Sequence, residues 1–176
     1  GYLGGRFSQY FAEIGYRVFV GSSRTDAELP FALKECSLVH TDFNDVDSLT
    51  NVLSEVDSIV HLASLNAKQS LQDPQLAIKV NGIGMYNLIQ ASTKTKIEHL
   101  LYFSTAHIYG SSLIGQVTEN TLPRPTNPYA ITHRLAEDIL MAAIANGDIR
   151  GTVIRLSNAI GMPITKEVNC WMLFVN

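Results

Sequence analysis

The chain has few cysteines, and its histidines form no pattern typical of a metal site. The two cysteines, Cys36 and Cys170, make no C-x-x-C pair and give no sign of a disulfide framework. The five histidines show no ligand-like spacing with cysteines or carboxylates, so the sequence predicts no bound metal. We therefore expect a protein of the reducing cytoplasm that works without a resident metal ion.

The chain also lacks a strongly basic segment and a long apolar run. It carries 13 lysines and arginines against 16 aspartates and glutamates, a net charge of −3. This balance provides no electrostatic footprint for nucleic acid or an anionic membrane surface. Apolar runs such as "WMLFV" (171–175) are far too short to span a bilayer, and no secretion leader is visible. The sequence thus predicts neither a nucleic-acid partner nor a membrane partner.

What the chain does have is an alternation of short apolar strands and amphipathic helices. The apolar pattern predicts strands at 17–21, 37–43, 58–64, 99–105 and 151–157. It predicts helices at 6–15, 44–56, 73–93 and 128–146, with a polar loop at 110–127. This alternation is typical of an α/β fold, and we expect a Rossmann-like doubly wound parallel sheet with helices on both faces.

A doubly wound sheet normally begins with a strand, whereas this chain begins with a predicted helix. In the strand order 3-2-1-4-5-6 the first strand lies at the centre of the sheet. Without it, buried backbone groups would stay unpaired, at a cost of about 1–3 kcal/mol each. We therefore expect residues before Gly1, or another chain, to supply a Val/Ile-rich first strand.

The segment "GYLGG" (1–5) has the spacing of a phosphate-binding loop. Gly1 and Gly4 match the last two glycines of a G-x-x-G-x-x-G motif, which lets backbone N–H groups approach a pyrophosphate. A turn before a helix is the alternative for so short a motif. Six further segments follow along the chain: "TDFND", "VHLAS", "VNGIGMYNL", "FSTAHIYG", "PYAITH" and "RLSNAIG".

With these seven segments in order, residues 1–163 resemble the extended short-chain dehydrogenase/reductase family, the NAD(P)-dependent sugar-nucleotide epimerases, dehydratases and reductases. The resemblance implies an oxidoreductase or epimerase that acts on a nucleotide-linked sugar, and it leaves a homodimer open. It also implies a dinucleotide-binding domain at 1–157. Residues 158–176 would begin a truncated substrate-binding region.

The resemblance assigns cofactor contacts to the ends of the predicted strands. Asp42 would accept a hydrogen bond from the adenine amino group, and Phe43 would line the adenine pocket. The other implied contacts are Gly1, Tyr2, Leu3 and Gly4 at the pyrophosphate, and Leu62, Ala63 and Ser64 at the ribose and phosphates.

The cofactor preference depends on the residues that follow the strand at 17–21. NAD-preferring folds usually place an acidic residue here, but this chain has Ser22, Ser23 and Arg24. Hydroxyls and a guanidinium suit a 2′-phosphate, which a carboxylate would repel. We therefore expect NADP(H) rather than NAD(H), with a solvated loop arginine as the alternative.

The catalytic residues implied by the resemblance are Thr105, Tyr129 and His133. Thr105 would hydrogen-bond the reacting sugar oxygen, and Tyr129 would exchange a proton with it. Dehydratases of the family carry Asp-Glu directly after this threonine, whereas this chain has Ala106 and His107. That difference favours epimerisation or simple oxidation and reduction over 4,6-dehydration.

His133 stands where the family has a lysine, one helical turn after Tyr129. A tyrosine titrates near ~10, so a nearby cation must lower its pKa for proton transfer at neutral pH. Histidine can donate a hydrogen bond to the cofactor ribose, but it is charged only below about 6.5 unless an acidic partner raises its pKa. Two interpretations stay open: an enzyme with altered chemistry, or a silenced NAD(P)-binding regulatory or scaffold protein.

Three polar residues complete the predicted site. By resemblance Ser157 lies near the nicotinamide, and Asn158 reaches the nucleotide sugar. Asn81 would steady the active-site loop, and a hydrogen bond between two helices explains it equally well.

Overall fold

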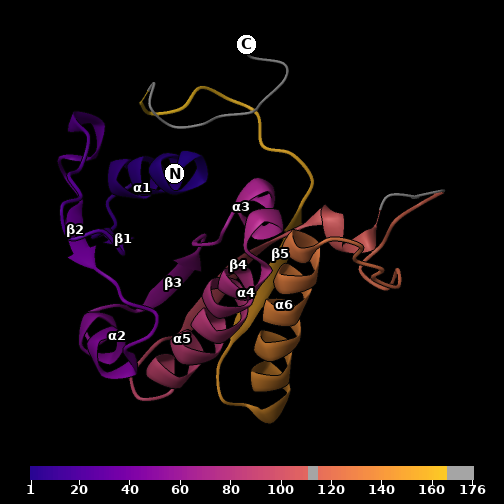
Figure 1. The fold of residues 1–176 in the computed structure, drawn as a ribbon. Coiled ribbons are helices and arrows are strands. Elements are labelled where there is room, and N and C mark those ends of the chain that lie inside the picture. Colours follow the sequence, from indigo (N-terminus) through magenta and orange to yellow (C-terminus); the bar gives the residue numbers. More distant parts are fainter. Residues whose placement is uncertain (111–114, 166–176) are drawn as a thin grey trace. The chain divides into compact units, whose positions relative to one another are not determined.

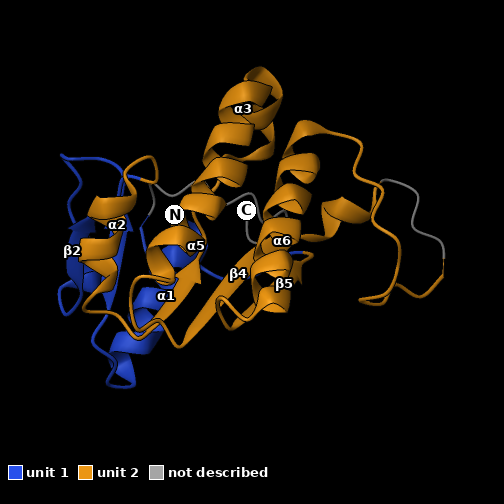
Figure 2. Cartoon of the chain, turned by 90° about the horizontal axis from the view of Figure 1, so that it is seen from below, with its two compact units in different colours: residues 1–42, 158–176 blue, residues 43–157 orange. Residues whose placement is uncertain are grey.

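A computed structural model describes residues 1–110 and 115–165. The chain forms two compact units, which Figure 2 distinguishes by colour. The first unit consists of residues 1–42 together with the residues from 158 onward, and the second consists of residues 43–157. The predicted substrate-binding region at 158–176 falls in the first unit, and its residues 166–176 lie outside the described part of the chain.

The first unit contains one long helix and a two-stranded parallel sheet. Helix α1 spans Tyr2–Glu13, and strands β1 (Phe19–Ser22) and β2 (Ser37–His40) pair in parallel. The chain leaves α1 through Gly15, whose φ of 95° favours glycine. The Tyr2 hydroxyl donates a hydrogen bond of 2.9 Å to the carbonyl of Gly161, which connects the residues after 157 to α1.

The second unit contains a three-stranded parallel sheet in the order β3–β4–β5 (Figure 1). The strands are β3 (Ser58–His61), β4 (His99–Thr105) and β5 (Gly151–Leu156), with β4 in the middle. The helices are α2 (Val46–Leu53), α3 (Ala67–Gln72), α4 (Pro74–Ala77), α5 (Gly84–Ser92) and α6 (Pro128–Asn146). A π-helical segment, Ile78–Ile83, joins α4 to α5, and a 3₁₀ turn, Ala106–Tyr109, follows β4.

The core of the second unit lies between its sheet and the helices α5 and α6. Alternate residues of β4, among them Leu100 and Tyr102, are buried against Leu88 of α5 and Leu140 of α6. Such alternation is expected because successive side chains of a strand point to opposite faces. This packing fixes β4 and α6 relative to each other, and both elements carry predicted catalytic residues.

Local sequence signals explain why α6 begins and ends where it does. The Asn127 side chain accepts a hydrogen bond of 2.9 Å from the Ala130 N–H, and Pro128 occupies the first helical position. Gly147 ends the helix with a φ of 79° in the left-handed region. The helix therefore has the same bounds that the sequence predicted.

The predicted α/β fold with parallel strands is confirmed, whereas several predicted boundaries are wrong. The helix predicted at 73–93 is confirmed over residues 74–92, although the sequence predicted neither its central π-helical segment nor the preceding α3. The strands predicted at 37–43 and 58–64 end at His40 and His61. Among the described residues no strand pairs with both sheets, so the expected additional central strand stays a prediction.

Candidate functional site

The second unit brings the three predicted catalytic residues together. Thr105 is the last residue of β4, while Tyr129 and His133 lie in the first two turns of α6. The rings of Tyr129 and His133 meet edge to face with centroids 4.5 Å apart, and the Thr105 side chain lies close enough to Tyr129 to lower its pKa. Thr105 also accepts a hydrogen bond of 3.2 Å from the His107 N–H, which starts the 3₁₀ turn. The arrangement places two hydroxyl groups and an imidazole in one small region.

Tyr102 is a member of this cluster that the sequence did not reveal. Its hydroxyl lies 2.7 Å from Nδ1 of His133, and both side chains are 2% exposed. Nε2 of His133 is buried and has no hydrogen-bond partner in the described structure. The imidazole is therefore held on one side by a phenol and carries an unsatisfied nitrogen on the other.

The cluster continues as a row of aromatic rings across the unit. The ring centroids of His61 and Tyr102 are 5.7 Å apart, and those of Phe43 and His61 are 5.3 Å apart. At the other end His107 contacts Tyr129 with a centroid distance of 5.9 Å. Phe43, which the sequence assigned to an adenine pocket, thus packs against a buried histidine within its own unit.

Burial keeps His61 and His133 neutral at pH 7. Desolvation, followed by the charge of neighbouring His107, lowers the pKa of His133 from 6.5 to about 4. Desolvation, followed by the charge of His133, lowers the pKa of His61 to about 4. The sequence left open an acidic partner that would raise the pKa of His133. The group at Nδ1 is instead the phenol of Tyr102.

Both tyrosines of the cluster are protonated at neutral pH. Burial raises the pKa of Tyr129, and the hydrogen bond from Thr105 offsets only part of that rise. Burial is also the main cause of the raised pKa of Tyr102. Since His133 is neutral, it does not supply the positive charge that would lower the pKa of Tyr129.

Asn81 forms the hydrogen bond between helical segments that the sequence offered as one alternative, and it also binds the backbone after β3. Its side-chain oxygen accepts a hydrogen bond of 3.0 Å from the Leu65 N–H, in the segment after β3. Its amide nitrogen donates a hydrogen bond of 2.9 Å to the Thr132 hydroxyl on α6. Asn81 is 2% exposed and lies in the π-helical segment, a distortion that often marks functional sites. It connects the segment containing Leu62, Ala63 and Ser64 to the helix that carries Tyr129.

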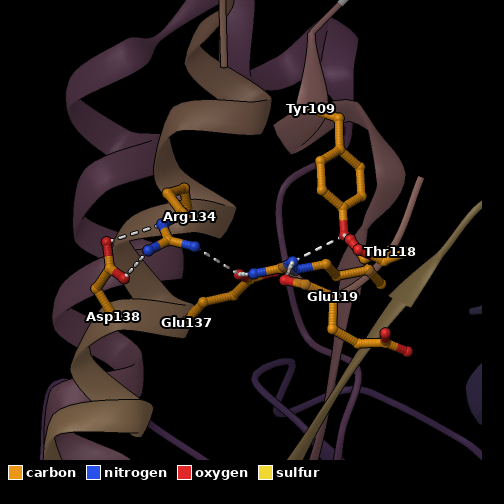
Figure 3. Close-up of polar contacts among 7 residues, drawn as sticks. Tyr109, Thr118, Glu119, Arg134, Glu137 and Asp138 are labelled. Atoms are coloured by element: carbon orange, nitrogen blue, oxygen red, sulfur yellow. Dashed lines mark hydrogen bonds and ion pairs between the residues drawn. The ribbon is translucent and has the colours of Figure 1, made fainter. Parts of the chain in front are cut away.

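A buried carboxylate next to the cluster was also not predicted. Glu137 on α6 is 1% exposed and forms an ion pair of 2.9 Å with Arg155 on β5. Arg134 approaches the same carboxylate at 3.4 Å (Figure 3). Nη1 of Arg155 donates hydrogen bonds to the Tyr109 hydroxyl at 2.8 Å and to the Glu119 carbonyl at 3.2 Å. These contacts link β5, α6 and the segment after the 3₁₀ turn.

The glycine segment of the first unit is helical rather than an extended loop. Gly1 is the N-cap of α1, and Tyr2, Leu3 and Gly4 form its first turn. A Cβ atom added at Gly1 or Gly4 would meet no atom within 4 Å. Packing within this unit therefore does not require glycine at these two positions, and the helix N-terminus leaves room for close approach by another group.

Arg24, which the sequence assigned to a 2′-phosphate, is paired with a carboxylate. Its Nε and Nη2 donate to Asp26 at 3.0 and 3.3 Å, and both side chains are exposed. Its backbone N–H donates a hydrogen bond of 3.1 Å to the Ser22 hydroxyl. Ser23 is exposed beside it. An anion at this place would compete with Asp26 for the guanidinium.

The remaining predicted contacts are residues at the points where the chain passes from one unit to the other. Asp42 is the last residue of the first unit before Phe43, whose carbonyl accepts a hydrogen bond of 2.7 Å from the Asn87 side chain. Ser157 and Asn158 are both exposed after β5. Within residues 1–110 and 115–165, no group of three or more possible metal ligands occurs. In the same ranges, no helix is both long and apolar enough to cross a membrane.

Comparisons with known proteins relate this arrangement to one family. The model of the NAD dependent epimerase/dehydratase family matches residues 1–169. A UDP-glucose 4-epimerase of Lactobacillus helveticus is 25% identical over 164 residues, covering 92% of this chain and 50% of the relative. A dTDP-glucose 4,6-dehydratase of Mycobacterium tuberculosis is 25% identical over 147 residues, covering 81% of this chain and 43% of the relative.

Solved structures give the same result for the fold. A UDP-glucose 4-epimerase of Thermotoga maritima, solved with UDP-glucose, has a TM-score of 0.84 at 22% identity. That match covers 97% of this chain and 57% of the solved one. A dTDP-glucose 4,6-dehydratase of Streptomyces venezuelae, solved with NAD bound, has a TM-score of 0.82 at 25% identity, with 92% and 54% covered. The chain spans about half the length of the relatives it matches.

Proposed function

The chain belongs to the NAD dependent epimerase/dehydratase family. On that premise we propose that it is part of an NAD(P)-dependent oxidoreductase or epimerase that acts on a nucleotide-linked sugar. The observation that carries this proposal is the contact of the Tyr129 ring with the buried His133, next to the Thr105 side chain. Together these groups can handle the proton of a sugar hydroxyl. The nucleotide-sugar relatives support the substrate class.

Each residue of the cluster has a distinct role in this proposal. The nicotinamide supplies hydride transfer when it is bound. Tyr129 gives a proton to the reacting sugar oxygen or takes it away, and the Thr105 hydroxyl hydrogen-bonds the same oxygen. His133 fits the ribose of the cofactor, because its buried Nε2 has no hydrogen-bond partner among the described residues. A ribose hydroxyl would satisfy that nitrogen.

The proposed chemistry differs from that of the family's lysine-containing members in one respect. A neutral His133 provides a hydrogen bond but no charge, so Tyr129 keeps its proton more tightly. We expect turnover that is slow at neutral pH and increases under alkaline conditions. The second candidate is a silenced NAD(P)-binding regulator of the same fold.

The type of reaction and the cofactor follow from residues next to the cluster. Ala106 and His107 replace the Asp-Glu of dehydratases, which supports epimerisation or simple oxidation and reduction. Ser22 and Arg24 support NADP(H) over NAD(H), although Asp26 competes for the guanidinium. The adenine, phosphate and sugar contacts predicted from the sequence, the cytoplasmic location and the homodimer belong to the same proposal.

The test separates the two candidates in two steps. Binding of NADH and NADPH to the intact gene product is measured first, by quenching of protein fluorescence. The protein is then incubated with a panel of UDP- and dTDP-hexoses between pH 7 and 10, and products are resolved by chromatography. We expect binding and alkaline turnover. Binding without turnover of any sugar would favour the regulator, and absence of nicotinamide binding would overturn both candidates.

A further inference from the structure

We propose that Tyr102 is a positioning residue: it donates its hydroxyl hydrogen to Nδ1 of His133 and so holds the imidazole as the neutral Nε2–H tautomer, a fixed donor for a ligand hydroxyl. The assignment of that ligand as a cofactor ribose rests on the proposed function. The tautomer and its cause rest on the geometry of this chain alone.

The position of Tyr102 in the sheet allows it to fix the orientation of the His133 side chain. It lies in the central strand of its sheet, opposite His61 of β3 on one side and Val153 of β5 on the other. Its side chain is 2% exposed and belongs to the hydrophobic core between the sheet and α6. Its hydroxyl reaches His133 across 2.7 Å, within the usual range for a strong hydrogen bond. A residue packed in this way has little freedom to move away from the imidazole.

The direction of this hydrogen bond follows from counting polar hydrogens. If the phenol donates, Nδ1 accepts and only the Nε2–H of His133 stays unpaired. If Nδ1–H donated instead, the phenol hydrogen of Tyr102 would need another buried acceptor, and Nε2 would keep an unsatisfied lone pair. The described contacts offer the phenol no second partner. Donation from Tyr102 is therefore the favoured arrangement.

The surroundings of His133 favour its neutral form. The rings in contact with it are those of Tyr102 and Tyr129, and both tyrosines are protonated at neutral pH. Its other ionisable neighbours are His61 and His107. The nearest carboxylate on its own helix, that of Glu137, is paired with arginines. No carboxylate in the described structure forms a hydrogen bond or ion pair with His133, so nothing compensates a buried imidazolium.

The unpaired Nε2–H of His133 indicates that this side chain binds a ligand. A buried polar hydrogen without a partner destabilises the folded protein, so its retention indicates a ligand that accepts it. A lysine can turn any of three ammonium hydrogens toward a ligand, whereas an imidazole offers a donor only in the correct tautomer. Replacing lysine by histidine therefore creates a need for a residue that fixes the tautomer. Tyr102 meets that need.

Nitrogen NMR of the intact gene product tests the proposal directly. Long-range ¹H–¹⁵N spectra distinguish a protonated ring nitrogen from an unprotonated one, and the spectrum of His133→Gln identifies the His133 signals. We expect an unprotonated Nδ1 and a protonated Nε2 in the wild type at pH 7.5. In Tyr102→Phe we expect averaged signals from a mixture of tautomers, and roughly fivefold weaker binding of the nicotinamide cofactor. The exposed Tyr86→Phe serves as the matched control and should change neither.

Two results would overturn the role of Tyr102. One is a wild-type His133 protonated at Nδ1, which can be read even if Tyr102→Phe does not fold. The other is a Tyr102→Phe protein whose His133 stays entirely in the Nε2–H form. A separate result would overturn only the assignment of the ligand as the cofactor ribose. If NADH and NADPH leave the Nε2–H signal of His133 unchanged, the tautomer assignment holds and the cofactor role does not.

Discussion

The predicted site residues are packed into the core in the second unit but exposed in the first. In the second unit Thr105, Tyr129 and His133 are drawn together by core packing and hydrogen bonds before any ligand is present. In the first unit Arg24 and Asp26 form an exposed ion pair that no packing holds in place. The groups proposed to handle the proton are thus built into the core of the fold, whereas the proposed recognition of a 2′-phosphate would depend on exposed side chains. Substitutions should affect chemistry and folding in the second unit, and only ligand preference in the first.

The largest effect is expected from Tyr129→Phe, which removes the proposed proton donor and leaves the ring in place. A positioned acid or base typically contributes about 10²–10⁴-fold to the rate, so kcat should fall by that factor. Cofactor affinity should change less than about threefold, because Tyr129 is assigned to the sugar hydroxyl. Tyr86→Phe on α5, where the side chain is 52% exposed, is the control. Unchanged turnover in Tyr129→Phe would remove the basis of the proposed chemistry.

The second prediction compares two adjacent carboxylates of α6. Glu137→Gln should lower the free energy of unfolding by about 3 kcal/mol, because it leaves Arg155 without its buried partner. Asp138→Asn should cost less than about 1 kcal/mol, because its pair with Arg134 is exposed. Urea denaturation of both variants provides the comparison. Equal losses would mean that the buried pair contributes no more than a surface contact.

The third prediction concerns pH, through the buried histidines of the second unit. The folded-state pKa of His61 and of His133 is about 4, below the ordinary 6.5. Between these values the unfolded chain binds more protons than the folded one, so stability falls as pH decreases from 6.5 toward 4. Each histidine contributes up to about 3 kcal/mol to that loss. His61→Phe should make the stability profile flatter in this window. A profile unaffected by His61→Phe would contradict the burial argument.

The strongest local signals were sufficient to predict β4 and α6. Strand 99–105 has apolar residues bounded by a polar loop, and α6 has Asn127 and Gly147 at its two ends. The helix predicted at 73–93 is present at 74–92, but its central π-helical segment was not predicted. A Cβ added at Gly82 would lie 2.5 Å from the Leu135 side chain of α6, so the backbone comes unusually close there. No local period encodes such an approach.

The parts of the site missed by the sequence are long-range pairs. In the sequence Tyr102 looks like an ordinary strand residue. Its hydroxyl finds a partner only in His133, which lies 31 residues later on α6. Glu137 and Arg155 are separated by 18 residues and meet because α6 packs against β5. Thr105, Tyr129 and His133 could be predicted because family motifs mark each of them. The supporting residues carry no such motif, since they act through the positions of other side chains.

The smallest effect is expected at Arg24, where the first unit offers only an exposed pair. Arg24→Ala should weaken NADPH binding by roughly tenfold or less and leave NADH binding unchanged. Asp26→Ala should strengthen NADPH binding, because it releases the guanidinium for the 2′-phosphate. Titration of both cofactors into the three proteins measures the effect. Tighter binding of NADH than NADPH by the wild type would end the NADP(H) proposal.

The measurement that most directly tests the account is a pH titration of the His133 imidazole in the intact gene product, followed by its ring ¹⁵N signals from pH 8 to 5. We predict no titration midpoint in this range and at most about a tenth of the imidazole protonated at pH 5, because burial lowers the pKa of His133 to about 4 and Tyr102 occupies Nδ1. The histidine would then supply a hydrogen bond without a charge. A titration midpoint at or above 6.5 would contradict this. His133 would then carry a positive charge and could take the role that the resemblance gives to a lysine at this position.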